Sequence, residues 1–173
     1  MNMNIFKVFL TGVAFVCLSI GVKAQGVDEK IATTGDCGAN GNNLTWVLTY
    51  DSVLVISGSG AMADFESEKS TPWYDYRYLV KTVIIGNEVT SIGDNAFYHC
   101  IKLKSIVIGD ALATIGEAAF FHCRSLESII IPNSVTTIGR IAFSGCTSLV
   151  EAVIPESVIL GEAAFGGCKK LQR

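Results

Sequence analysis

A unit of about 23 residues is repeated through the second half of the chain and limits the folds open to it. An Ile-Gly pair, an Ala-Phe pair and a cysteine recur in register four times, with Leu-Gly in place of Ile-Gly in the last repeat. The Ala-Phe pairs begin at Ala96, Ala119, Ala142 and Ala164, so the repeats are 23, 23 and 22 residues apart. A fixed period in this range indicates a solenoid, in which each repeat packs on its neighbours. We therefore predict one elongated domain.

Within each repeat, the apolar spacing separates core positions from surface positions. In the third repeat, Ile129 and Ile131 are two residues apart and point to one face of a strand, which Pro132 then ends. Gly139 is expected to allow a backbone conformation that a side chain would disfavour, and Ala-Phe-x-x-Cys is expected to form a short helical turn. The predicted fold is mainly β with short helical turns, a right-handed solenoid with a parallel sheet. The predicted core positions are Ile92, Phe97, Cys100, Ile115, Phe120, Cys123, Ile138, Phe143, Cys146, Phe165 and Cys168.

The segment before the repeats is predicted to cap them. Leu44, Trp46 and Leu48 alternate with polar or smaller residues, and residues 53–56 are rich in β-branched side chains, so two strands should form a hairpin. Ordered structure is expected to begin near Asn43. An aromatic cluster beginning at Trp73 leads into the repeats. A solenoid needs a distinct end repeat, so we assign residues 25–78 to a linker and N-terminal β-hairpin cap, and residues 79–173 to four repeats and the start of a fifth.

The first 24 residues have the pattern of a secretory signal peptide. Lys7 precedes an apolar run over residues 8–22, and small residues at Val22 and Ala24 favour cleavage near Ala24. Cleavage removes two lysines and no acids, which changes the formal charge from −3 to −5. An acidic chain lacks the basic footprint that nucleic acid requires. No other apolar run is long enough to span a bilayer, so we predict a secreted or cell-surface protein without a membrane span in the mature chain.

The repeat resembles the BspA-type leucine-rich repeat of bacterial surface proteins. The resemblance is carried by the unit x-x-L-x-x-I-x-I-P-x-S-V-T-x-I-G-x-x-A-F-x-x-C, whose proline is present as Pro132 and Pro155 and is glycine in the first two repeats. The preceding segment shares it through Pro72-Trp73. The resemblance implies a leucine-rich-repeat fold and an exported adhesion or protein-binding role, with host extracellular matrix proteins among the ligands of some members.

The outward face of the predicted sheet is the candidate binding site. It should present a polar column and an apolar column side by side, a concave strip of the kind that solenoids use for recognition. β-Branched residues also suit a parallel ladder without any ligand, so both interpretations stay open. The polar column is Thr82, Ser105, Ser128 and Glu151, and the apolar column is Ile84, Val107, Ile130 and Val153.

The predicted function is binding of a protein or glycoprotein ligand through this strip. The alternatives are a structural spacer or a fragment of a larger surface protein, and carbohydrate binding through Trp73, Tyr74 and Tyr76, which cap packing would instead bury. Leu171 matches the opening leucine of a fifth repeat and no polar cap follows it. We therefore expect a truncated chain or end-to-end self-association.

The repeat cysteines are predicted to be core residues, and the two histidines are predicted to bind no metal. Four cysteines at equivalent inward positions favour free thiols that act as small hydrophobic side chains, with a disulfide, including one to Cys37, as the alternative. His99 and His122 each precede a repeat cysteine, which suggests zinc, but an inward cysteine implies an outward histidine. The chain shows no nucleophile paired with a base and no phosphate-binding loop. We predict no enzyme activity, no cofactor and no metal.

Overall fold

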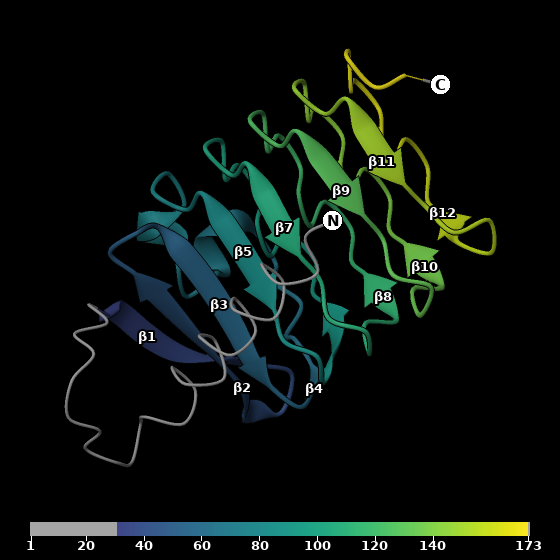
Figure 1. Cartoon of the computed structure of the whole chain (residues 1–173). Helices are drawn as coiled ribbons and strands as arrows, with labels where there is room; N and C mark the ends of the chain where they lie inside the picture. Colours follow the sequence, from purple (N-terminus) through teal and green to yellow (C-terminus); the bar gives the residue numbers. More distant parts are fainter. Residues whose placement is uncertain (1–30, 173) are drawn as a thin grey trace, which may run out of the picture.

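The structure is a computed structural model that describes residues 31–172, which form a stack of short strands (Figure 1). The predicted signal peptide lies outside the described residues. The front ladder runs in spatial order through β1 (Ile31–Gly38), β2 (Gly41–Thr49), β3 (Val53–Gly58), β5 (Thr82–Ile85) and β7 (Ser105–Val107), and β9 (Ser128–Ile130) and β11 (Glu151–Val153) pair beyond it. Every pair from β3 onward is parallel. The predicted mainly β architecture with a parallel sheet is confirmed.

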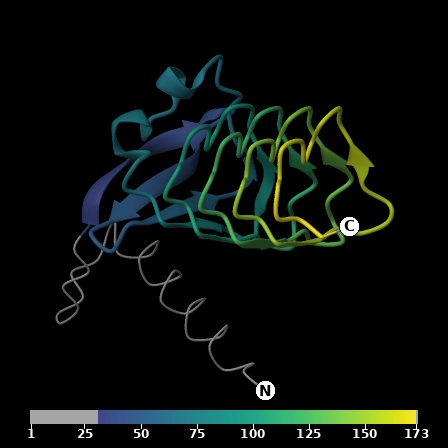
Figure 2. The same ribbon diagram turned by 90° about the horizontal axis from the view of Figure 1, so that it is seen from above.

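A second parallel sheet lies at the far side of each repeat. It consists of β4 (Gly60–Ala61), β6 (Val89–Ile92), β8 (Thr114–Ile115), β10 (Thr137–Ile138) and β12 (Ile159–Leu160). Seen from above, the chain winds once through both sheets in each repeat (Figure 2). The Ile of each Ile-Gly pair ends one of these strands and packs inward.

The Ala-Phe-x-x-Cys segment is a series of tight turns closed by hydrogen bonds between residues three apart, such as Cys146 N to Phe143 O at 3.3 Å, and these turns do not continue into a helix. Within residues 31–172 the helical elements are two 3₁₀ helices, η1 (Glu68–Ser70) and η2 (Tyr74–Tyr76), so no helix there is long enough to cross a membrane. In the third repeat, Ile141 and Gly145 have φ values of 49° and 77°. Because left-handed residues interrupt helical hydrogen bonding, the segment cannot continue as a helix.

Stacked aromatic rings run through the centre of the molecule. Ring centroids lie 5.1 Å apart between Phe97 and Phe120, 5.1 Å between Phe120 and Phe143, and 5.0 Å between Phe143 and Phe165. Trp73 extends the stack at 5.4 Å from Phe97. These separations are in the range of favourable aromatic pairs, so each repeat contributes one ring to a continuous core.

The cysteines lie beside this aromatic stack. Cys100, Cys123 and Cys146 are buried, and the Cys123 thiol donates to the Phe97 carbonyl oxygen of the previous repeat at 3.2 Å. Phe165 and Cys168, in the last repeat, are only half-buried because the described chain supplies a neighbouring repeat on one side. The other predicted core positions are buried.

The glycine of each Ile-Gly pair is required by close backbone approach rather than by backbone angle. A Cβ on Gly139 would lie 2.6 Å from the backbone nitrogen of Glu117 in the previous repeat. The expectation that Gly139 adopts an unusual conformation was therefore wrong. A small residue is needed because adjacent repeats are in contact here.

The cap contains the predicted hairpin and one strand more. β2 and β3 pair antiparallel, and β3 then pairs parallel with β5, so the hairpin begins the repeat ladder. The expectation that order begins near Asn43 was wrong, because β1 adds to the outer edge of β2. Thr34 Oγ1 donates to the Trp46 carbonyl oxygen at 2.6 Å, and a Cβ on Gly35 would lie 2.7 Å from Trp46 Nε1. Thr34 thus bonds β1 to the backbone of Trp46, and Gly35 leaves room for the Trp46 ring.

Candidate binding surface

The predicted surface columns lie in register on the front sheet. Thr82 pairs with Ser105 and Ile84 with Val107 between β5 and β7. Ser128 pairs with Glu151 and Ile130 with Val153 between β9 and β11. The residues between the two columns face the core, since Val83 and Ile129 belong to the core cluster and Ile106 and Ala152 pack against it. Side chains alternate along a strand, so both columns are on the opposite side of the sheet. We call these eight residues the front strip.

The ladder beneath the front strip is interrupted between β7 and β9. The strands on either side belong to separate sheets, although a backbone hydrogen bond of 3.4 Å from Glu127 N to Lys104 O lies just before them. Figure 1 shows β9 and β11 continuing the row of strands beyond β7. The front strip therefore has an early part, on β5 and β7, and a late part, on β9 and β11.

Exposure differs sharply between these two parts. The exposed fraction is 6% for Ile84, 70% for Ile130 and 47% for Val153. The prediction that Ile84 is available to a ligand was wrong. Ile84 sits in the ladder between Val55 and Val107, so β-branched side chains pack against it on both sides.

The late part of the front strip combines apolar and polar groups. Ile130 and Val153 are exposed neighbours, and Ser128 and Glu151 lie exposed two residues before them. In the early part, Thr82 Oγ1 and Ser105 Oγ are 3.1 Å apart and satisfy each other. The most exposed apolar side chains of the front strip and its one carboxylate therefore lie on β9 and β11.

The cap aromatics do not form the platform considered for sugar stacking. Trp73 is fully buried, and its Nε1 donates to the Ala96 carbonyl oxygen at 2.8 Å. Tyr74 is half-buried, and the Arg77 guanidinium stacks 3.7 Å from its ring centroid. Tyr76 is 36% exposed. A platform that needs the Trp73 ring is excluded, because that ring is the first member of the core stack.

The described cysteine and histidine side chains do not form a reactive thiol site or a metal site. The five cysteines of residues 31–172 are free thiols, and burial raises the pKa of Cys100 to about 12, so this thiol stays protonated near pH 7. Within the same residues no three His, Cys, Asp or Glu side chains gather closely enough to hold a metal ion. His99 and His122 face each other at 5.2 Å between ring centroids.

Stacked repeats, parallel ladders and a shared aromatic core together define a leucine-rich-repeat solenoid. Residues 73–173 match the family model described as "BspA type Leucine rich repeat region (6 copies)", which covers more than half of the chain. This chain belongs to the BspA-type leucine-rich-repeat family.

Solved bacterial proteins share the fold. A leucine-rich repeat protein from Eubacterium ventriosum ATCC 27560 is 26% identical, with a TM-score of 0.64, over 82% of this chain and 43% of its own. A leucine-rich repeat protein from Bacteroides ovatus ATCC 8483 is 38% identical, with a TM-score of 0.52, over 55% of this chain and 24% of its own. This chain thus spans less than half the length of either protein. No protein of curated function matches it.

Proposed function

We propose that this chain is an exported, surface-displayed binding module that recognises a protein or glycoprotein through the late part of its front strip. The observation that carries the proposal is the pair of exposed, adjacent apolar side chains Ile130 and Val153, which are 70% and 47% exposed. Both follow exposed polar residues on the same face. An apolar centre with a polar border is the usual composition of a protein-binding surface.

Two further features support this proposal. BspA-type repeats are of the bacterial surface type, and a signal peptide is predicted at residues 1–24. The repeat positions facing the core hold the fold together, which leaves the outward positions free to vary. A solenoid presents such positions as an extended surface suited to a large partner rather than to a small molecule.

The test is a binding screen against immobilised extracellular matrix proteins. The full chain is compared with an Ile130→Lys/Val153→Lys double variant, which places two charges in the centre of the proposed surface. We expect micromolar binding to at least one matrix protein, and a loss of at least about tenfold in the variant.

The matched control is Thr114→Lys on β8. Thr114 is also an exposed, β-branched strand residue, but it lies on the second sheet. It should fold and bind like the unmodified chain. A chain that binds no matrix protein would favour the spacer alternative, and equal binding by the double variant would place the contact elsewhere.

A further inference from the structure

The residue before each repeat cysteine adopts a left-handed backbone conformation in all four repeats. Its φ is 57° at both His99 and His122, 77° at Gly145 and 71° at Gly167. Glycine is the least costly residue there. The last two repeats use glycine, whereas the first two use histidine. Non-glycine residues before each Ala-Phe pair, Asn95, Ala118, Ile141 and Ala163, also have positive φ, so this conformation alone assigns no function. What distinguishes the first two repeats is that a ring stands at the position before the cysteine.

Both histidines belong to a surface cluster of rings. Tyr98 and Phe121, which occupy one repeat position, stack at 4.8 Å between ring centroids, beside the His99–His122 pair. All four rings are half-buried. The third and fourth repeats place serine or glycine at the same positions, so this ring cluster exists on the first two repeats only.

A small open hollow adjoins the ring cluster. It has a volume of about 260 Å³ and is lined by Tyr78, His99, Ile101 and Arg124. Arg77 holds Tyr78 in place, because its guanidinium lies 4.0 Å from the ring centroid and its Nη2 donates to the Tyr78 hydroxyl at 2.9 Å. A hollow of this size is below the range for drug-sized ligands and suits one ring-sized group.

The hollow is lined by one cation, Arg124, and one imidazole, His99, and the second imidazole, His122, lies next to Arg124. Arg124 Nη2 lies 3.2 Å from His122 Nδ1. A guanidinium can only donate, so Nδ1 accepts and the ring proton is on Nε2. Burial, and then the charge of Arg124, lower the pKa of His122, while burial, and then His122, lower that of His99. Both rings therefore stay neutral near pH 7.

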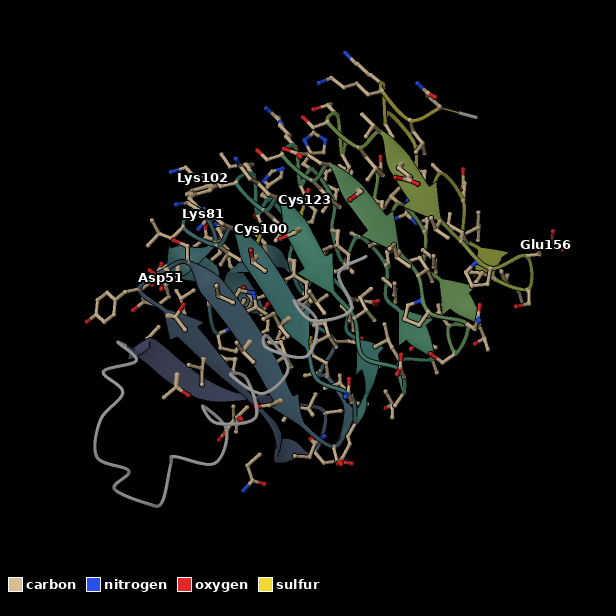
Figure 3. The ribbon with its side chains drawn as sticks, viewed as in Figure 1. Asp51, Lys81, Cys100, Lys102, Cys123 and Glu156 are labelled. Carbon is tan, nitrogen blue, oxygen red and sulfur yellow. The ribbon has the colours of Figure 1, made fainter. Side chains whose placement is uncertain are left out.

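The edge that carries the hollow bears lysines as well as acids, in a chain whose net charge is −3. Lys81 and Lys102 are labelled along the same edge as Cys100 and Cys123, where Asp51 lies beside Lys81, and Glu156 lies at the opposite edge (Figure 3). Among residues 31–172, the single ion pair joins Arg140 to Glu117. Arg124 thus has no carboxylate partner in that part of the protein.

We propose that the hollow binds a carboxylated sugar, at a site separate from the front strip. The Tyr78 and His99 rings contact the C–H face of the sugar ring, and Ile101 closes the apolar side. Arg124 takes the carboxylate through paired N–H···O bonds, and His122 orients Arg124. An acidic side chain of a protein would satisfy Arg124 but would leave the ring surfaces without an apolar partner. Ring surfaces, the His99 imidazole and a guanidinium without a carboxylate partner among residues 31–172 together favour the sugar.

The test is calorimetric titration of the full chain with sialyllactose and with lactose, which lacks the carboxylated residue. We expect sialyllactose to bind at least about tenfold more tightly, as one charge-assisted pair predicts. Arg124→Thr, which copies Thr147 of the third repeat, should remove that preference. Lys169→Ala removes the cation at the same position of the fourth repeat and should change nothing.

A second variant separates binding from folding. His99→Gly/His122→Gly restores the glycine that the last two repeats use, so the thermal midpoint should stay within a few degrees while sialyllactose binding is lost. Equal binding of both sugars, no binding at millimolar sialyllactose, or sialyllactose binding that survives in both variants would overturn the proposal. Arg124-dependent binding of a glutamate-rich peptide without sialyllactose binding would also overturn it and would assign the hollow to protein recognition.

Discussion

Ile84 in the first repeat and Ile130 in the third occupy one repeat position, yet they are 6% and 70% exposed. At the position before each repeat cysteine, the early repeats carry the larger surface group, since His99 has a ring where Gly145 has no side chain. The early repeats thus offer a ring cluster at one edge, and the late repeats offer an apolar surface on the front sheet. A shared core lets neighbouring repeats carry different surfaces, because a solenoid repeat contacts only its neighbours.

The largest expected effect concerns the core stack that both halves share. Phe120 is fully buried between two rings, so Phe120→Ala should lower the free energy of unfolding by about 3–5 kcal/mol through the cavity it leaves. Phe165 is half-buried at the end of the stack, and Phe165→Ala should cost less than half as much. Urea denaturation measures both. Equal losses of stability would show that a ring inside the stack contributes no more than a ring at its end.

A charge at the shared front position should distinguish the early and late repeats. Ile84→Lys buries an ammonium group and should destabilise the protein by about 3 kcal/mol. Ile130→Lys, at an exposed site, should remain within about 0.5 kcal/mol of the unmodified chain. Paired thermal melts check this. If Ile84→Lys were as stable as Ile130→Lys, the buried state of the early part would be contradicted.

The two glycines that precede repeat cysteines, Gly145 and Gly167, should differ in how much stability an alanine substitution costs. A Cβ on Gly145 would lie 2.5 Å from His122 Cδ2 in addition to requiring positive φ, so Gly145→Ala should cost about 2 kcal/mol. Gly167 has the same backbone form but its nearest contact would be 3.6 Å away, so Gly167→Ala should cost about 1 kcal/mol. Adding His122→Gly should recover part of the Gly145→Ala loss. No recovery would exclude the ring as the cause.

The smallest expected effect is a pH dependence that arises from the two histidines. Their pKa values are lowered from 6.5 in the folded protein, mainly by burial, so the unfolded chain binds more protons than the folded one as pH falls below about 6.5. Stability should therefore decrease between pH 7 and pH 5. The His99→Gly/His122→Gly variant should show a shallower decrease in the same melts. Identical slopes would show that the two half-buried imidazoles do not cause the pH dependence.

Sequence periodicity predicted the core well because every repeat places the same side chain in the same environment. Ile138, Phe143 and Cys146 are buried where their spacing put them. The eight residues of the front strip also lie in register on the side away from the core, because residue alternation along a strand is strict. These features follow from local geometry repeated at a fixed period.

Features that depend on neighbouring strands could not be predicted in this way. The burial of Ile84 depends on Val55, a cap residue that becomes its ladder neighbour only after β3 pairs with β5. β1 was missed because its threonines and glycines are typical of a loop in sequence, although Gly35 is where the backbone must avoid Trp46. The cost of His99 became visible only with its left-handed φ. Comparison with the glycines of the later repeats was the available sequence signal.

The most direct test of the proposed binding surface is hydrogen exchange of the full chain with and without the matrix protein that binds it best. We predict slower amide exchange over residues 128–130 and 151–153, on β9 and β11, and no change over residues 114–115 and 137–138, on β8 and β10. Protection confined to the second sheet would contradict the assignment of recognition to the late part of the front strip.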